Sequence, residues 1–566
     1  MSGGLDHLVA TLLSELANSP KRAEKSAKRA LKSHPDQHDL LFVSGLIALN
    51  LDKTREARNF FLRSINTGHA AAAAYLNAGI AEAHLGDLTK ALRILAAGRT
   101  KFPSDQELTQ TTIKLAIAHG APEDALAIAR AALTDNADTA ELLSLAGRAA
   151  EAAGNLPDAL HYFEAALAQR ETDTILRDLS RIYAFTNQPE KALNAARRAC
   201  ALAPNELSNV FDLAWRETET GDFSAAQQHF RQSLSDQTLA CEALRMLCEL
   251  SDPPSPTEIT ALVDTLSPAA QSQTDRGHLE LARYHTAKAA SAADPFKHLA
   301  AANRHYAKDR RYDAQQDRRY HAAILDAYDR AEALPPPETA PTPRPIFILG
   351  MIRTGTTLLD RLLSTAPQTH SLGEVAATDR FFRHALSQPT PDIDLGALAQ
   401  SYAAIQALIG PAAVTIDKMP ANYMYIGWLH RAFPGCRVIL MERDMRDVAA
   451  SAFENYFNTM PMNFTFREDW LAQKFEIYAS QIAAWEAREA SFLKVSYERL
   501  VSAPHDTLAD IAAYCGFASL PDPDRLIQPG SIRTASFAQA RQGINTASVA
   551  RWPAFASLLP TICKPD

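Results

Sequence analysis

The stretch that decides the fold of the C-terminal half is ILGMIRTGTTLLDRLL, residues 348–363. Its two glycines, Gly350 and Gly355, have the spacing of the glycines in the nucleotide-binding pattern G-x-x-x-x-G-K-[ST]. Thr356 takes the place of the lysine, and Arg353 stands inside the loop. The stretch therefore predicts a loop that binds an anion but lacks the lysine that reaches a γ-phosphate.

The sequence on either side of this loop predicts a strand and a helix. Residues 346–349 (IFIL) read as a buried strand, and residues 357–366 (TLLDRLLSTA) read as a helix. In this context the backbone N–H groups at the helix start point at a bound phosphate, and the hydroxyl groups of Thr356 and Thr357 would add donors.

Three further segments, residues 413–416, 437–442 and 492–497, also read as strands, with helical segments between them. This alternation predicts an α/β domain with a central parallel sheet and helices on both faces. Ligands bind at the carboxyl ends of the strands in such domains, and the candidate motifs lie there.

The loop carries a specific family resemblance. GMIRTGTTLLDRLL resembles the 5′-phosphosulfate-binding loop of sulfotransferases that use 3′-phosphoadenosine 5′-phosphosulfate (PAPS). Ile352 replaces the family's usual proline and Thr354 its usual serine, while the core Arg-x-Gly-Thr-Thr is intact. The resemblance implies a P-loop-like phosphosulfate site made of Arg353, Thr354, Gly355, Thr356 and Thr357.

A second motif, MERDMRDVAAS at residues 441–451, resembles the 3′-phosphate site of the same family. The resemblance assigns the phosphate to Arg443, at the end of a strand, and to Ser451, on the following helix. The chemistry agrees, because a phosphate dianion is bound well by a guanidinium and hydroxyl donors.

Further stretches resemble the tyrosylprotein sulfotransferase branch and related bacterial enzymes that contain repeats. In SLGE, Glu374 takes the place of the catalytic glutamate, and in IDKMPANY, Lys418 takes the place of a lysine near the bridging oxygen of the sulfate. Ser536 matches a serine near the 5′-phosphate, Tyr497 matches a tyrosine beside the nucleotide, and Arg551 replaces a lysine that precedes a tryptophan. The resemblance covers roughly residues 344–566.

The N-terminal half contains a repeat. The segments DKTREA, GDLTKA, GAPEDA, GNLPDA, NQPEKA and GDFSAA end in alanines spaced by 34, 34, 34, 33 and 34 residues, namely Ala57, Ala91, Ala125, Ala159, Ala192 and Ala226. Small residues recur about twelve positions before most of these alanines. The pattern resembles the tetratricopeptide repeat (TPR), in which small side chains let two antiparallel helices cross closely and neighbouring pairs stack.

The sequence thus predicts a multidomain chain. An all-α TPR superhelix of about seven repeats covers residues 1–249, a helical linker region covers 250–335, and the sulfotransferase-like domain covers 344–566. The proline-rich residues 334–345 (LPPPETAPTPRP) mark the last boundary, because they cannot form regular helix or strand.

Composition limits the classes of function. The net charge of −8 does not support a general nucleic-acid binder. The six cysteines form no C-x-x-C pair and predict reduced thiols. The N-terminus lacks the features of a signal peptide, and no apolar run is long enough to span a bilayer. We expect a cytoplasmic protein without a membrane span.

The expected activity is transfer of a sulfuryl group from PAPS to a hydroxyl, in which PAP (3′-phosphoadenosine 5′-phosphate) is the product and no metal takes part. The branch suggests a protein tyrosine as acceptor, while a saccharide, a lipid and a small phenol stay open. The TPR groove would recruit a peptide or protein acceptor, or serve as a spacer or a homodimer surface. Two alternatives remain, a P-loop kinase or NTPase, and a TPR scaffold with a silent sulfotransferase-like domain.

Overall fold

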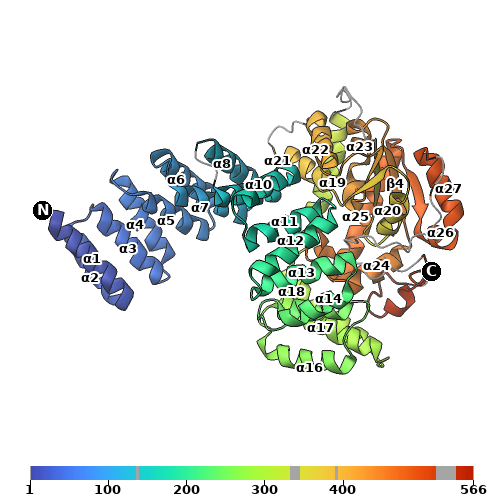
Figure 1. Cartoon of the computed structure of the whole chain (residues 1–566), viewed down its shortest axis with the longest axis horizontal. Helices are drawn as coiled ribbons and strands as arrows, with labels where there is room; N and C mark the ends of the chain where they lie inside the picture. The colour runs from blue at the N-terminus through green and yellow to red at the C-terminus, as the bar shows by residue number, and fades with distance from the viewer. Residues whose placement is uncertain are drawn as a thin grey trace. The chain divides into compact units, whose positions relative to one another are not determined.

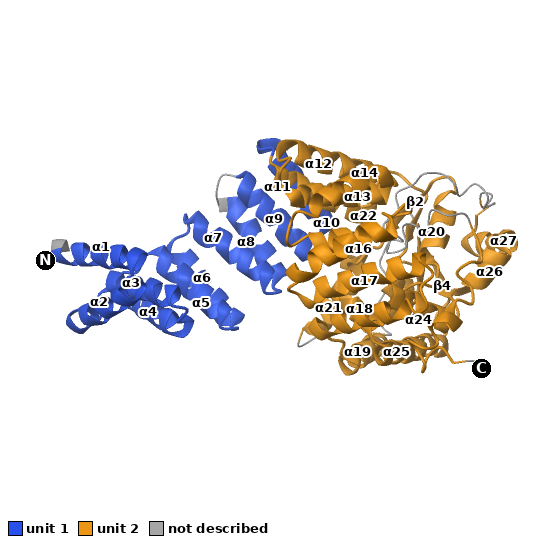
Figure 2. Cartoon of the chain, turned by 90° about the horizontal axis from the view of Figure 1, so that it is seen from below, with its two compact units in different colours: residues 1–171 blue, residues 172–566 orange. Residues whose placement is uncertain are grey.

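The computed structural model describes residues 2–135, 139–331, 344–388, 393–517, 520 and 544–564, and Figure 1 shows the chain with many of its helices labelled. The chain divides into two compact units, Met1–Glu171 and Thr172–Asp566 (Figure 2). All five tryptophans, at positions 215, 428, 470, 485 and 552, belong to the second unit. No helix of the described residues is both long enough and apolar enough to cross a membrane.

The first unit is built from helices joined by tight turns. They are α1 (Ser2–Asn18), α2 (Pro20–Ser33), α3 (His38–Asn50), α4 (Thr54–Asn66), α5 (Ala72–His84), α6 (Leu88–Lys101), α7 (Gln106–Ala118), α8 (Pro122–Asp135), α9 (Ala140–Ala152) and α10 (Leu156–Gln169). Small residues allow the pairs to pack closely. A Cβ on Gly79 of α5 would come within 2.5 Å of Leu95 Cγ on α6.

The second unit begins with further helix pairs of the same kind. Its helices before the sheet are α11 (Asp173–Phe185), α12 (Pro189–Leu202), α13 (Leu207–Thr220), α14 (Phe223–Ser233), α15 (Ala240–Glu249), α16 (Pro256–Leu266), η1 (Ser267–Ala269), α17 (Gln273–Ala289), α18 (Phe296–Asp309) and α19 (Ala314–Arg330). The six repeat alanines are at most 1% exposed. The predicted array of TPR-like helix pairs is confirmed.

The sheet of the second unit has five strands in the order β2-β3-β1-β4-β5, and every neighbouring pair is parallel. The strands are β1 (Arg344–Gly350), β2 (Thr369–Gly373), β3 (Val414–Asp417), β4 (Arg437–Glu442) and β5 (Leu493–Ser496). The predicted parallel sheet is confirmed. β2 was not predicted, because THSLG is short and largely polar.

Helices connect the strands and cover both faces of the sheet. They are α20 (Thr356–Ser364), α21 (Ala377–Ser387), α22 (Leu395–Ala407), η2 (Pro420–Tyr425), α23 (Ile426–Ala432), α24 (Met445–Glu454), η3 (Met460–Phe466), α25 (Glu468–Ala487), α26 (Tyr497–Ser502), α27 (Pro504–Cys515) and η5 (Trp552–Phe555).

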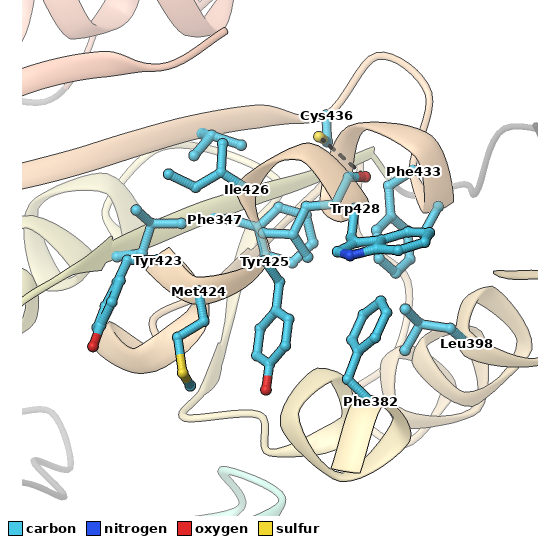
Figure 3. Packing of buried hydrophobic residues seen from close by; sticks show 14 of the residues in the cluster. Phe347, Phe382, Leu398, Tyr423, Met424, Tyr425, Ile426, Trp428, Phe433 and Cys436 are labelled. Carbon is cyan, nitrogen blue, oxygen red and sulfur yellow. Dashed lines mark hydrogen bonds between the residues drawn. The ribbon is translucent and has the colours of Figure 1, made fainter. Parts of the chain in front are cut away.

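One apolar cluster fills the space between the sheet and α19, α21, α22, α23 and α25 (Figure 3). The ring of Phe382 stacks on that of Tyr425 with 4.9 Å between centroids. The indole N–H of Trp428 donates to the carbonyl oxygen of Ile324 on α19 at 3.2 Å. Helix α19, which precedes the proline-rich segment, is therefore part of the core under the sheet.

Candidate active site

The predicted site residues follow the carboxyl ends of all five strands. Glu374 follows β2, Lys418 follows β3, the loop 351–355 follows β1, Arg443 follows β4 and Tyr497 follows β5. Neighbouring strands lie about 4.8 Å apart, so the five positions span roughly 19 Å along one edge. Their spatial order is the strand order, with the glycine loop after β1 in the centre.

The loop after β1 is held in a shape that requires its glycines. Gly355 has φ +94°, and a Cβ there would lie 2.5 Å from the ring of Tyr497. A Cβ on Gly350 would lie 2.6 Å from the carbonyl oxygen of Met441 on β4. Thr354 is buried, and its hydroxyl donates to the carbonyl oxygen of Met351 at 2.7 Å. The hydroxyl of Thr354 thus braces the loop.

Arg353 and Ser451 meet across the sheet edge. The Nε of Arg353 donates to Ser451 Oγ at 2.8 Å, although the two residues are 98 positions apart in the sequence. Arg353 has φ +66°, a left-handed conformation that is uncommon for a residue with a side chain and that often marks functional sites. Burial and the nearby charge of Arg443 lower the pKa of Arg353 to about 10.

Arg443 contacts the backbone of the same loop. One Nη donates to the carbonyl oxygen of Arg353 at 2.9 Å and the other to the carbonyl oxygen of Ser548, while the guanidinium lies 4.5 Å over the ring of Tyr497. Its buried Nε has no hydrogen-bond partner among the described residues. Burial lowers the pKa of Arg443. Two crowded guanidinium groups beside the start of α20 make a donor set that fits a phosphate.

Arg551 is brought to the same region by the C-terminal segment 544–564. Asp447 on α24 accepts hydrogen bonds from the backbone N–H groups of Ala550 at 2.7 Å and Trp552 at 2.8 Å. Arg551 Nη2 forms an ion pair with Glu454 Oε2 at 2.7 Å. Our sequence reasoning missed Glu454, since a carboxylate one turn after Ser451 gives no signal by itself.

Glu374 and Lys418 form the other end of the site. Lys418 Nζ donates to Glu374 Oε1, which joins two predicted residues that are 44 positions apart. The lysine side chain is 4% exposed and the glutamate side chain 43% exposed. A buried ammonium therefore holds a carboxylate that reaches solvent, as a group that must take a proton from an incoming substrate would. Ser536 lies outside the described residues.

Thr356 and Thr357 open α20 directly after Gly355. Thr356 is buried and Thr357 is half-buried. Within the described part of the chain, no group of three or more histidine, cysteine or acidic side chains could hold a metal ion.

A comparison with protein families finds one match in this part of the chain. Residues 345–522 match the sulfotransferase family. Residues 345–522 are a sulfotransferase-family domain. Apart from the first residue of β1, the match includes all five strands and with them the glycine loop, Glu374, Lys418 and Arg443, while the segment with Arg551 lies beyond it.

Two relatives have related sequences. An uncharacterized protein of Aquifex aeolicus is 26% identical over 248 residues, which are 40% of this chain and 32% of that protein. The match thus spans about a third of that relative's length. A Caenorhabditis briggsae protein described as "Putative protein-tyrosine sulfotransferase" is 23% identical over 226 residues, which are 37% of this chain and 80% of that protein.

Solved structures with a similar arrangement of helices include two repeat proteins. One is a tetratricopeptide repeat protein from Parabacteroides merdae, with 16% identity, a TM-score of 0.34, and coverage of 42% of this chain and 97% of that chain. The other is YrrB, a TPR protein, with 18% identity, a TM-score of 0.28, and coverage of 32% and 95% respectively.

Proposed function

We propose that this chain is a sulfotransferase that transfers the sulfuryl group of PAPS to a hydroxyl acceptor, with a protein tyrosine favoured. The observation that carries the proposal is the state of Arg443. Among the described residues, its two Nη groups donate to backbone carbonyl oxygens, and its Nε has no hydrogen-bond partner. Its positive charge thus remains available to an anionic ligand held against the glycine loop.

The donor would lie along the sheet edge with its nucleotide end at β4 and β5. Arg443 and Ser451 would bind the 3′-phosphate, and Tyr497 would line the nucleotide site. The 5′-phosphosulfate would lie on the loop, where Gly355, Thr356 and Thr357 present N–H and hydroxyl donors at the start of α20. Arg353 and Thr354 shape this loop, and Arg551 adds a nearby cation.

The reaction would take place at the β2–β3 end. The acceptor oxygen attacks sulfur, the bond between sulfur and the bridging oxygen breaks, and PAP keeps the electron pair. Glu374 takes the proton of the acceptor hydroxyl. Lys418, Arg353 and Ser536 would stabilise the charge that develops on the bridging oxygen and the 5′-phosphate. Lys418 must then shift part of its interaction from Glu374 to the donor.

A phenol is the favoured acceptor because its pKa of about 10 makes proton loss easier than for an alkyl alcohol. The relative described as a protein-tyrosine sulfotransferase supports this choice. One contact supports a role of the repeats in acceptor binding. Asn187, in the turn between α11 and α12, donates to the carbonyl oxygen of Ser371 on β2 at 2.7 Å, three residues before Glu374.

The first test is thermal stability with PAP in metal-free buffer. PAP at 100 times its dissociation constant should stabilise the wild type by about 2.7 kcal/mol, and Arg443→Ala should lose this gain. Arg437→Ala is a matched control, because Arg437 also donates to a carbonyl oxygen and lies over a tyrosine ring, but at the amino end of β4. Stabilisation by Mg-ATP and not by PAP would instead indicate a kinase or NTPase.

The second test is transfer of labelled sulfate from PAPS to tyrosine-containing peptides, with a saccharide and a simple phenol as competing acceptors. Glu374→Gln should lower kcat by at least 100-fold, the lower range for loss of a general base, while PAP still binds. Binding of PAP without transfer to any hydroxyl would favour a scaffold with a silent domain.

A further inference from the structure

Asp417 is a buried carboxyl beside the two residues proposed for proton transfer and charge stabilisation. It is 0% exposed, it ends β3, and it directly precedes Lys418. Its Oδ1 accepts a hydrogen bond from the backbone N–H of Val375 at 3.3 Å. Val375 directly follows Glu374. The carboxylate of Asp417 therefore contacts the backbone next to Glu374, while Asp417 itself is the neighbour of Lys418 in the sequence.

The backbone around Glu374 is fixed on both sides. The N–H of Lys418 donates to the carbonyl oxygen of Gly373 at 2.8 Å, and Asp417 Oδ1 binds the N–H of Val375. Glu374 therefore lies between two residues that are bonded to the end of β3. The ion pair between its carboxylate and Lys418 Nζ closes the arrangement.

The second carboxylate oxygen of Asp417 also accepts hydrogen bonds. Oδ2 accepts hydrogen bonds from the hydroxyl of Tyr402 on α22 and from Asn422 Nδ2 on η2, the latter at 3.0 Å. Tyr402 in turn lies 3.0 Å from the hydroxyl of Thr378 on α21. The network reaches three elements and has no contact with the glycine loop among its hydrogen bonds. Burial raises the pKa of Asp417 to about 7, because its carboxylate is shielded from water.

We propose that Asp417 is a positioning residue for sulfuryl transfer, which fixes the backbone that carries Glu374 and Lys418 and thereby their mutual geometry. This inference rests on the proposed function. The inference separates catalysis from nucleotide binding, because Asp417 lies at the β2–β3 end while the nucleotide would bind at β1, β4 and β5. A change at Asp417 should therefore act on kcat and leave PAP binding intact.

Asp417→Asn is the informative variant because it keeps the shape of the side chain. The asparagine has one acceptor oxygen, which cannot accept both from Val375 on one side and from Tyr402 and Asn422 on the other, so the hold on the backbone beside Glu374 is weakened. Thr415→Val is the matched control. Thr415 is buried two residues earlier on the same strand, and its hydroxyl accepts from Gln406 at 2.7 Å.

The measurements are the dissociation constant of PAP, and kcat and KM for PAP release from PAPS with a tyrosine-containing peptide, across pH 5–9. We expect Asp417→Asn to lower kcat at least tenfold, to leave the PAP dissociation constant within twofold, and to displace the pH profile of kcat/KM. Thr415→Val should match the wild type in all three.

Two results would overturn the inference. One is a kcat and pH profile of Asp417→Asn within twofold of the wild type. The other is an equal loss of PAP binding and kcat in Asp417→Asn and Thr415→Val, which would show a purely structural role. Failure of the wild type to bind PAP would be a different outcome, because it would remove the proposed function itself.

Discussion

Glu454 joins groups from three distant parts of the second unit. Its Oε1 accepts from the hydroxyl of Tyr284 at 2.6 Å and from Lys288 Nζ at 2.5 Å, both on α17, and its Oε2 pairs with Arg551. Burial alone would raise the pKa of Glu454, but the charges of Arg551 and Lys288 outweigh it and lower the pKa to about 2. The ionised carboxylate therefore connects α24 to α17 and to the C-terminal segment 544–564.

We predict that Glu454→Gln destabilises the second unit by about 1–2 kcal/mol at pH 7, because the half-exposed Lys288 and the partly buried Arg551 lose the buried carboxylate with which they pair. The folded pKa lies below the ordinary value of 4.5. The stabilisation is thus complete above about pH 4.5 and is lost as the pH falls toward 2. Urea unfolding followed by tryptophan fluorescence reports on this unit alone. The prediction would be contradicted if the difference in unfolding free energy between wild type and variant stayed constant below pH 4.5.

Gly355→Ala is predicted to abolish the stabilisation by PAP. A Cβ at this position meets the ring of Tyr497 at 2.5 Å and requires φ +94°, so the loop must change its shape. The control is Gly435→Ala, where φ is +80° but no atom lies within 4 Å of the new Cβ. Both variants should lose about 1–2 kcal/mol through backbone strain. Only the first should lose the thermal shift with PAP.

Elements differ in how well the sequence predicts them. β4 has the predicted bounds, Arg437–Glu442, because RVILME is a buried run of strand-forming residues. The helix pairs follow from alanines that recur where helices touch. β2 was not predicted because it has no apolar run. It forms a strand by pairing with β3, a contact that the local sequence does not indicate.

Residues of the candidate site could be proposed from the sequence only where they belong to a motif. Arg353, Ser451, Glu374 and Lys418 do, and the structure brings them together in two pairs. Glu454 and Asp417 lie beside these motifs, but their partners are on other elements. No local pattern of the sequence records such contacts.

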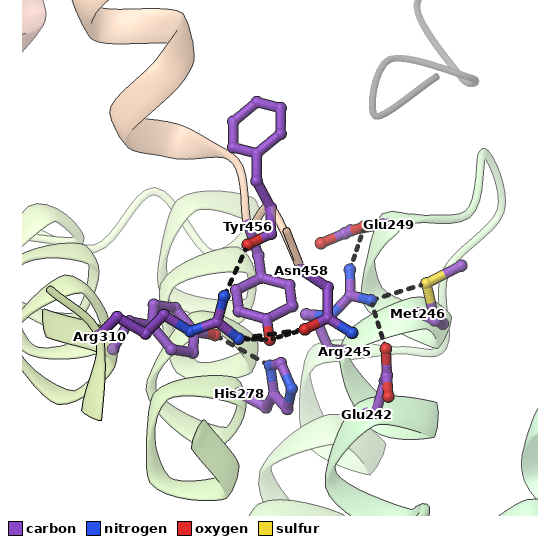
Figure 4. A network of polar contacts seen from close by, with 10 residues as sticks. Glu242, Arg245, Met246, Glu249, His278, Arg310, Tyr456 and Asn458 are labelled. Carbon is purple, nitrogen blue, oxygen red and sulfur yellow. Dashed lines mark hydrogen bonds and ion pairs between the residues drawn. The ribbon is translucent and has the colours of Figure 1, made fainter. Parts of the chain in front are cut away.

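Helix α24 is anchored at its C-terminal end by helices of the region before the sheet. Asn303 on α18 donates to the carbonyl oxygen of Phe453 at 3.0 Å. The ring of Tyr456 lies between two guanidinium groups, those of Arg245 and Arg310, each 5.1 Å away (Figure 4). Arg310 also binds the carbonyl oxygen of Phe457 at 3.1 Å. These contacts fix the helix that carries Ser451.

We predict that Tyr456→Leu lowers the stability of the second unit by about 2–4 kcal/mol, because both cation–π contacts are lost and the buried Arg245 loses an aromatic neighbour. Tyr456→Phe keeps the ring and should cost about 1 kcal/mol through the lost hydrogen bond with Arg310. Thermal unfolding monitored by tryptophan fluorescence gives both values. Equal losses in the two variants would mean that the ring–guanidinium contacts contribute nothing.

At the scale of the whole molecule, the second unit contains both repeat helices and the sulfotransferase domain. The boundaries predicted at residues 249 and 344 are proposals that fragments can test. A fragment of residues 172–566 should bind PAP like the full chain. A fragment of residues 344–566 should not, since it lacks Tyr284, Lys288, Asn303 and Arg310 and exposes the core face covered by α19. Equal PAP affinity of both fragments, measured by calorimetry, would show that the shorter one folds and functions alone.

The order of the site residues along the sheet has a consequence for how such a protein can diversify. The residues proposed to bind the donor follow β1, β4 and β5, whereas those proposed to meet the acceptor follow β2 and β3. Mutations around the residues that follow β2 and β3 can therefore accumulate without weakening the binding of the donor. A lineage built on this plan could exchange one acceptor for another by drift at a single flank, and a designer could graft new acceptor loops there while leaving the other flank untouched.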